Sequence, residues 1–121
     1  MIYESVVTID SGLANGVTYT VAKASFERRL ELMRRIRELA RRMEFLEAGG
    51  EPGDKMDAAL LRAEIDRIWV LWGLRAVGGL ELDGNPATPE SLALAGPEHL
   101  FREALAAVRA QAGLTDPERK N

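Results

Sequence analysis

Hydrophobic positions alternate with polar ones near the start of the chain. Residues 2–9 are rich in β-branched and aromatic side chains, and in residues 17–21 two valines and a tyrosine share one face while two threonines share the other. Between these segments, residues 10–12 (Asp-Ser-Gly) and 15–16 (Asn-Gly) are turn sequences, because Gly and Asn tolerate positive φ. The pattern predicts an antiparallel hairpin with a long loop.

The spacing then changes to that of a helix, predicted from Phe26 to about Ala48. Ser25 can cap its start, and Gly49 with Gly50 ends it. Apolar residues at intervals of three and four form one stripe: Leu32, Ile36, Leu39, Met43 and Leu46.

A second helix is predicted over residues 54–76, with Asp54 as its cap, Asp57 close behind, and Gly78-Gly79 after its end. Its main stripe consists of Leu61, Ile65, Ile68 and Trp72, and it is broadened by Leu60, Trp69 and Leu71. The C-terminal half is therefore apolar almost all round. Such a helix is buried on more than one side, within the domain or at an interface.

Shorter elements follow. Residues 80–82 are extended, residues 83–86 form a turn, and Thr88 caps a short helix that has Pro89 at its first position. A last helix is predicted over residues 97–112, before Gly113. Its inner face would be Leu100, Phe101, Leu105 and Val108.

Strands followed by helices predict an α+β fold, with an N-terminal β-hairpin followed by a mainly helical bundle of three to four helices. We expect one domain over residues 1–121. It comprises the hairpin (1–24), the helical part (25–112) and a polar tail (113–121).

Length and composition support a folded domain. A chain of 13.3 kDa buries roughly two-thirds of its unfolded surface, and 46% hydrophobic residues is typical of globular proteins. The longest apolar run, residues 68–72, is too short to span a membrane, and the start of the chain lacks a basic region typical of signal peptides. We therefore expect a cytoplasmic protein that does not bind membranes.

Enzyme chemistry is not indicated. There is no cysteine, which excludes disulfides, a thiolate nucleophile and cysteine-ligated metals. His99 is the single histidine and is expected on the surface of the last helix. Glu64 and Asp66 are two residues apart and so point to different sides of a helix, which disfavours a shared metal. We predict no catalytic residue, no cofactor and no metal site.

Charge is uneven along the chain. Residues 23–42 contain eight basic and three acidic residues, a net +5 within a chain of net −3. A basic patch of this kind attracts phosphates or an acidic protein surface. The candidates are Arg34, Arg35, Arg41 and Arg42. Since the pI is near 5.2 and no recognition motif accompanies the patch, nucleic-acid binding is the weaker hypothesis.

Two tryptophans lie three residues apart on the second predicted helix. The expectation is that Ile65, Ile68, Trp69 and Trp72 cannot all be covered by one side of a small core. The remainder would be covered by the hairpin, by the last helix or by another subunit. In the last case the protein is a homo-oligomer or keeps an apolar patch for a client, and these four residues become candidate protein-binding residues.

Residues 79–92 read Gly-Leu-Glu-Leu-Asp-Gly-Asn-Pro-Ala-Thr-Pro-Glu-Ser-Leu, and residues 112–121 read Ala-Gly-Leu-Thr-Asp-Pro-Glu-Arg-Lys-Asn. These segments, with the hairpin followed by a helix, resemble the tail assembly chaperones of long-tailed bacteriophages. The resemblance implies a non-enzymatic protein of the host cell cytoplasm that binds the tape measure protein and recruits tail tube subunits. The alternatives are a minor structural or head–tail joining protein of phages and a small nucleic-acid-binding regulator using the basic helix at 23–42.

Overall fold

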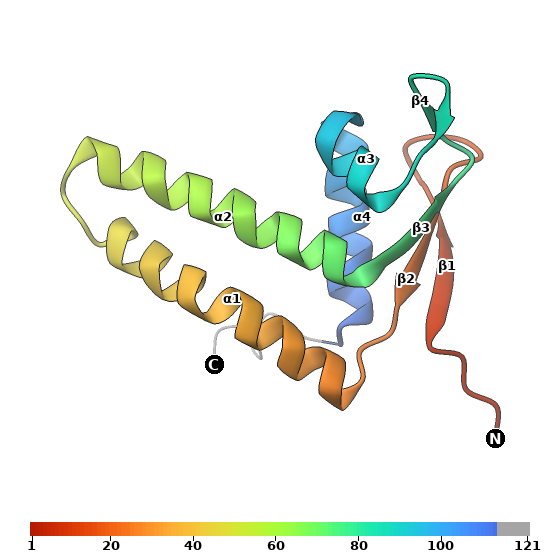
Figure 1. Cartoon of the computed structure of the whole chain (residues 1–121), viewed down its shortest axis with the longest axis horizontal. Helices are drawn as coiled ribbons and strands as arrows, with labels where there is room; N and C mark the ends of the chain where they lie inside the picture. The colour runs from red at the N-terminus through yellow and green to blue at the C-terminus, as the bar shows by residue number, and fades with distance from the viewer. Residues whose placement is uncertain (114–121) are drawn as a thin grey trace.

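A small antiparallel sheet lies at one end of the molecule, and two long helices run away from it side by side (Figure 1). The computed structural model describes residues 1–113. These residues include three-stranded and two-stranded sheets and four helices. The predicted α+β class is confirmed. The polar tail predicted after Gly113 lies outside the described residues.

The predicted N-terminal hairpin is confirmed. Strands β1 (Val6–Asp10) and β2 (Thr18–Ala22) pair antiparallel, with Thr8 opposite Thr20 and their hydroxyl oxygens 3.2 Å apart. Gly16 in the connecting loop has φ of +83°, which glycine adopts without strain. The first strand is shorter than predicted, because pairing begins at Val6 and not at residue 2.

A third strand, β3 (Leu74–Gly78), lies antiparallel to β2 and gives the order β1-β2-β3. The predicted helix over residues 54–76 is therefore wrong at its C-terminal end, since α2 is Pro52–Gly73. Leu74 to Val77 fit a helix or a strand equally well by pattern. Hydrogen bonding to β2 is what makes them a strand, and Gly73 ends the helix.

The start of α2 also differs from the prediction. Glu51 occupies the cap position and makes no side-chain capping bond, whereas Asp54 lies within the first turn. Pro52 is the first residue of the helix, where its missing N–H costs no hydrogen bond. Asp54 thus adds negative charge to the positive end of the helix dipole without capping it.

Other predicted helix signals are confirmed. Helix α1 is Phe26–Glu47, and the Ser25 side chain accepts a hydrogen bond from the amide of Arg28. Helix α3 is Pro89–Ala95, and its capping box joins Thr88 to Ser91. These bonds satisfy backbone amides that a helix start otherwise leaves free.

The last helix, α4 (Glu98–Gln111), begins one residue after the predicted start and ends before Gly113, whose φ is +74°. The predicted turn at 83–86 belongs to a small ribbon formed by β4 (Glu81–Leu82) and β5 (Asn85–Pro86).

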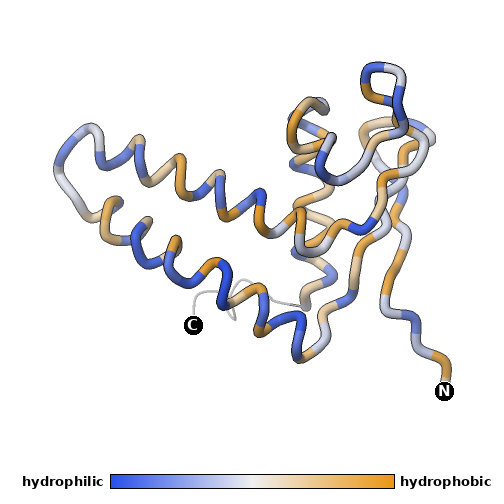
Figure 2. Tube along the Cα trace, viewed as in Figure 1, coloured by the Kyte–Doolittle hydropathy of each residue, from blue (hydrophilic) through white to orange (hydrophobic). Residues whose placement is uncertain are grey.

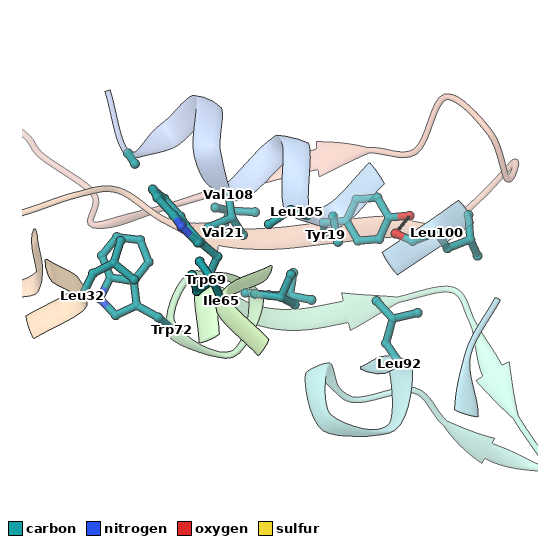
Figure 3. Close-up of a cluster of buried hydrophobic side chains, with 14 of the residues drawn as sticks. Tyr19, Val21, Leu32, Ile65, Trp69, Trp72, Leu92, Leu100, Leu105 and Val108 are labelled. Atoms are coloured by element: carbon teal, nitrogen blue, oxygen red, sulfur yellow. Dashed lines mark hydrogen bonds between the residues drawn. The ribbon is translucent and has the colours of Figure 1, made fainter. Parts of the chain in front are cut away.

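The core lies where α4 and the C-terminal part of α2 pack against the sheet (Figure 3). Its buried members come mainly from β2, β3 and all four helices, and they include Tyr19, Val21, Leu32, Ile65, Trp69, Trp72, Leu92, Leu100, Leu105 and Val108. Gly73 allows this close packing, because a β-carbon there would collide with Val108. Farther along the helix pair, hydrophobic and hydrophilic residues alternate turn by turn (Figure 2).

Candidate functional site

The apolar residues predicted to bind a partner lie in the core. Ile65, Trp69 and Trp72 are 8%, 5% and 3% exposed, and Ile68 is half-buried. Of the elements expected to cover the side chains that one side of a core leaves open, the last helix is one that does so, because α2 packs against α4 as well as against α1 close to the sheet. No second subunit is needed to bury these side chains.

Polar groups complete the surroundings of both tryptophans. The rings meet edge to face, with centroids 5.9 Å apart. The indole N–H of Trp72 donates to the Arg28 carbonyl at 3.0 Å, and the Arg28 guanidinium lies 5.0 Å from the Trp72 ring centre. The Arg109 guanidinium of α4 lies 5.5 Å from the Trp69 ring centre. Burial of both rings, the hydrogen bond of the Trp72 indole and the cationic neighbours indicate a structural role for the two tryptophans.

The four candidate arginines lie on the exposed surface of α1, apart from the buried tryptophans. Arg35 pairs with Glu31 at 2.7 Å, and Arg41 lies 4.0 Å from Glu38. Arg34 and Arg42 make no ion pair with any residue from 1 to 113. Acidic neighbours on the same helix therefore neutralise only part of this basic surface.

An exposed apolar surface does occur, but nearer the other end of the same helices. We define the arm as residues 37–64, the end of the α1–α2 pair that projects away from the sheet (Figure 1). Within the arm, all of which the structure describes, Ala58 is the only buried residue. Phe45, Met56 and Leu60 are 81%, 66% and 60% exposed. Large apolar side chains gathered on one exposed element mark interaction surfaces.

A groove of about 830 Å³ runs between the two helices of the arm. Its lining is mainly apolar, with Phe45, Leu46, Leu60 and Leu61 contributing side chains. Charged residues line its two sides: Arg41 and Arg42 from α1, Asp57 and Glu64 from α2. Two of the four candidate arginines therefore lie beside an apolar groove, whereas Arg34 and Arg35 are not among its lining residues.

Asp66 is a buried acidic residue whose role the sequence analysis missed. Its carboxylate is 7% exposed and accepts hydrogen bonds from Arg102 at 2.6 Å and Arg109 at 2.9 Å, both on α4. The two ion pairs fix α2 against α4. Because each oxygen of the Asp66 carboxylate already accepts a hydrogen bond from an arginine, the carboxylate has little capacity to bind a further ligand. The signal in the sequence that could have indicated this burial is that Asp66 directly follows Ile65, a residue of the main apolar stripe.

Glu103 connects α4 to the N-terminal hairpin. Its carboxylate accepts hydrogen bonds from the Ser11 hydroxyl at 2.5 Å, the Tyr19 hydroxyl at 2.7 Å and the Gly12 amide at 2.8 Å. Burial raises the pKa of Glu103, but these hydrogen bonds outweigh burial and hold its pKa below the usual value. Burial and the neighbouring carboxylate raise the pKa of Tyr19 to about 12. These hydrogen bonds join α4 to the N-terminal hairpin, so the cluster has a structural role.

His99 is exposed in the first turn of α4, as predicted. Among residues 1–113, no group of three or more histidine, aspartate or glutamate side chains is arranged to hold a metal ion. Within the same residues, no helix combines the length and apolar character needed to cross a bilayer. A second, smaller hollow of about 530 Å³ lies along α1 and is lined by Arg34 and Arg41 among others. We take the larger groove of the arm as the candidate functional site.

Comparison with known proteins found no matching family, no similar curated protein and no similar solved structure.

Proposed function

We propose that this protein is a non-enzymatic binding protein that holds a helical segment of another protein against its arm. In the specific form suggested by the sequence resemblance, it is a phage tail assembly chaperone of the host cytoplasm. Its clients would be the tape measure protein and the tail tube subunits.

The observation that carries this proposal is the exposed apolar groove of the arm. A groove between two helices with a mainly apolar lining is suited to the apolar face of an amphipathic helix. Phe45 and Leu60 offer large contact areas at the groove, and the core beneath α2 does not depend on them. The arm can therefore bind and release a client without disturbing the fold.

The regulator alternative has less support. Binding to nucleic acid through α1 requires several unpaired arginines on one face. On α1, Glu31 and Glu38 lie beside Arg35 and Arg41, and the chain as a whole is acidic. The head–tail joining alternative differs in a measurable way, because such a protein stays in the finished virion.

The test is co-expression with the tape measure and tail tube proteins encoded beside this gene, followed by affinity capture. We expect a complex that Phe45→Ala combined with Leu60→Ala weakens at least tenfold. Leu94→Ala is the matched control, since Leu94 is 89% exposed on α3, outside the arm. Equal loss with the control, or no complex with either client, would reject the chaperone proposal. Detection of the protein in purified virions would favour the joining alternative.

A further inference from the structure

Opposite charges lie on the two sides of the arm's groove. Arg41 and Arg42 belong to the α1 side, and Asp57 and Glu64 belong to the α2 side. None of the ion pairs among residues 1–113 crosses the groove between these four side chains. Arg41 lies near Glu38 and Glu64 pairs with Arg67, each within its own helix. The lining of the groove is thus mainly apolar, and its charged residues are basic on α1 and acidic on α2.

This arrangement is self-complementary under a two-fold rotation. A two-fold interface uses the same patch on both subunits, so a patch of one charge would repel itself. When the rotation places α1 of one subunit over α2 of the other, each basic side meets an acidic side. The apolar residues of the two grooves then face each other at the centre.

We propose that the occupant of the groove is a second copy of this chain, and that the two arms form a four-helix bundle. Each arm supplies two antiparallel helices with one unpartnered apolar face, which is half of such a bundle. Phe45 and Leu60, more than half exposed in one chain, become central contacts in the pair. Arg41 and Arg42 of each subunit lie against Asp57 and Glu64 of its partner.

A dimer of this kind goes beyond the proposed client binding and does not require it. It covers the apolar surface while no client is bound, and a client helix would compete for the same groove. The two ideas fail separately, because oligomeric state is measured on the purified protein alone and client capture is measured by co-expression.

The experiment is sedimentation analysis of charge-reversed variants, with circular dichroism to establish that each is folded. Wild type is expected to be a dimer. Arg41→Glu with Arg42→Glu makes both sides acidic, and Asp57→Lys with Glu64→Lys makes both sides basic. We expect each double variant alone to dimerise at least about 100-fold more weakly, because like charges are juxtaposed.

Mixing the two double variants is expected to restore a dimer containing one copy of each, and combining all four changes in one chain is expected to restore a homodimer. The control is Arg34→Glu with Arg35→Glu, on the same helix but outside the groove. This variant should dimerise as strongly as wild type. A monomeric wild type would overturn the proposal and assign the groove to a client if capture succeeds. A dimer that survives both reversals, or mixtures that stay monomeric, would also overturn it.

Discussion

The two halves of α2 form a comparison within one helix. Residues 65–73 lie against the sheet and α4, and six of these nine residues are buried. Residues 52–64 lie in the arm, and only Ala58 is buried there. Large apolar side chains occur in both halves, although they are more frequent in residues 65–73. What separates them is whether a third element covers the helix.

The comparison shows that apolar character along a helix does not by itself locate a binding surface. The most apolar half, with both tryptophans, stabilises the fold. The less apolar half, with Phe45 of α1 beside it, presents the groove. Substitution by alanine should therefore lower the free energy of unfolding much more at core residues than at the exposed residues of the arm.

The largest contrast is expected between Trp72→Ala and Phe45→Ala. Removing the buried indole deletes packing and the hydrogen bond to the Arg28 carbonyl, and should lower the free energy of unfolding by about 4 kcal/mol. Removing the exposed Phe45 ring should change the monomer's stability by less than about 0.5 kcal/mol. Chemical denaturation measures both, with Phe45→Ala compared with a monomeric charge-reversed parent. Similar losses in the two variants would contradict the division into core and arm.

An intermediate effect is expected at Asp66. Replacing it by Ala leaves Arg102 and Arg109 without their buried partner and should cost about 3 kcal/mol, the low end for breaking a buried ion pair, because both arginines are partly exposed. The matched control is Glu64→Ala, two residues away, whose carboxylate pairs with Arg67 at the surface, and both variants are made in the monomeric Arg41→Glu, Arg42→Glu parent. That change should cost less than about 1 kcal/mol. Equal losses would show that Asp66 does not fix α2 against α4.

A smaller and pH-dependent effect is expected at Glu103. At neutral pH, Glu103→Gln weakens the hydrogen bonds from Ser11, Tyr19 and Gly12, at a cost of about 2 kcal/mol. Because the pKa of Glu103 is lowered on folding, its contribution is complete above the pKa of the unfolded chain and disappears as the pH falls through the folded pKa. The difference between wild type and the variant should therefore shrink below about pH 4.

Ionisation of Tyr19 gives folding stability the opposite dependence on pH, at high pH. Folding raises the pKa of Tyr19 from 10.0 to about 12. The stability linked to the protonated hydroxyl is complete below pH 10.0 and is lost as the pH rises towards 12. Glu98→Gln is the control in both the low-pH and the high-pH range, since the Glu98 side chain is 81% exposed. A stability difference at Glu103 that does not vary with pH would contradict the ionised hydrogen-bond cluster.

Local chemistry in the sequence determined the hairpin, the caps at Ser25 and Thr88, and the α+β class. These features depend on neighbours a few residues apart: alternation of side chains, hydroxyl caps and glycines with positive φ. The sequence also indicated which α2 residues are apolar and where α1 is basic. Each of these outcomes follows from interactions within one element or one turn.

Tertiary structure decided the rest. Residues 74–78 become a strand because β2 offers them hydrogen bonds, and Trp69 and Trp72 are core residues because α1 and α4 cover them. Asp66 and Glu103 acquire their roles from partners 36 to 92 residues away in the chain. The groove exists because the loop after α1 folds α2 back along it while no third element among residues 1–113 follows the pair to its end. Which apolar face remains uncovered depends on the packing of whole elements, and the pattern within a single helix does not contain that information.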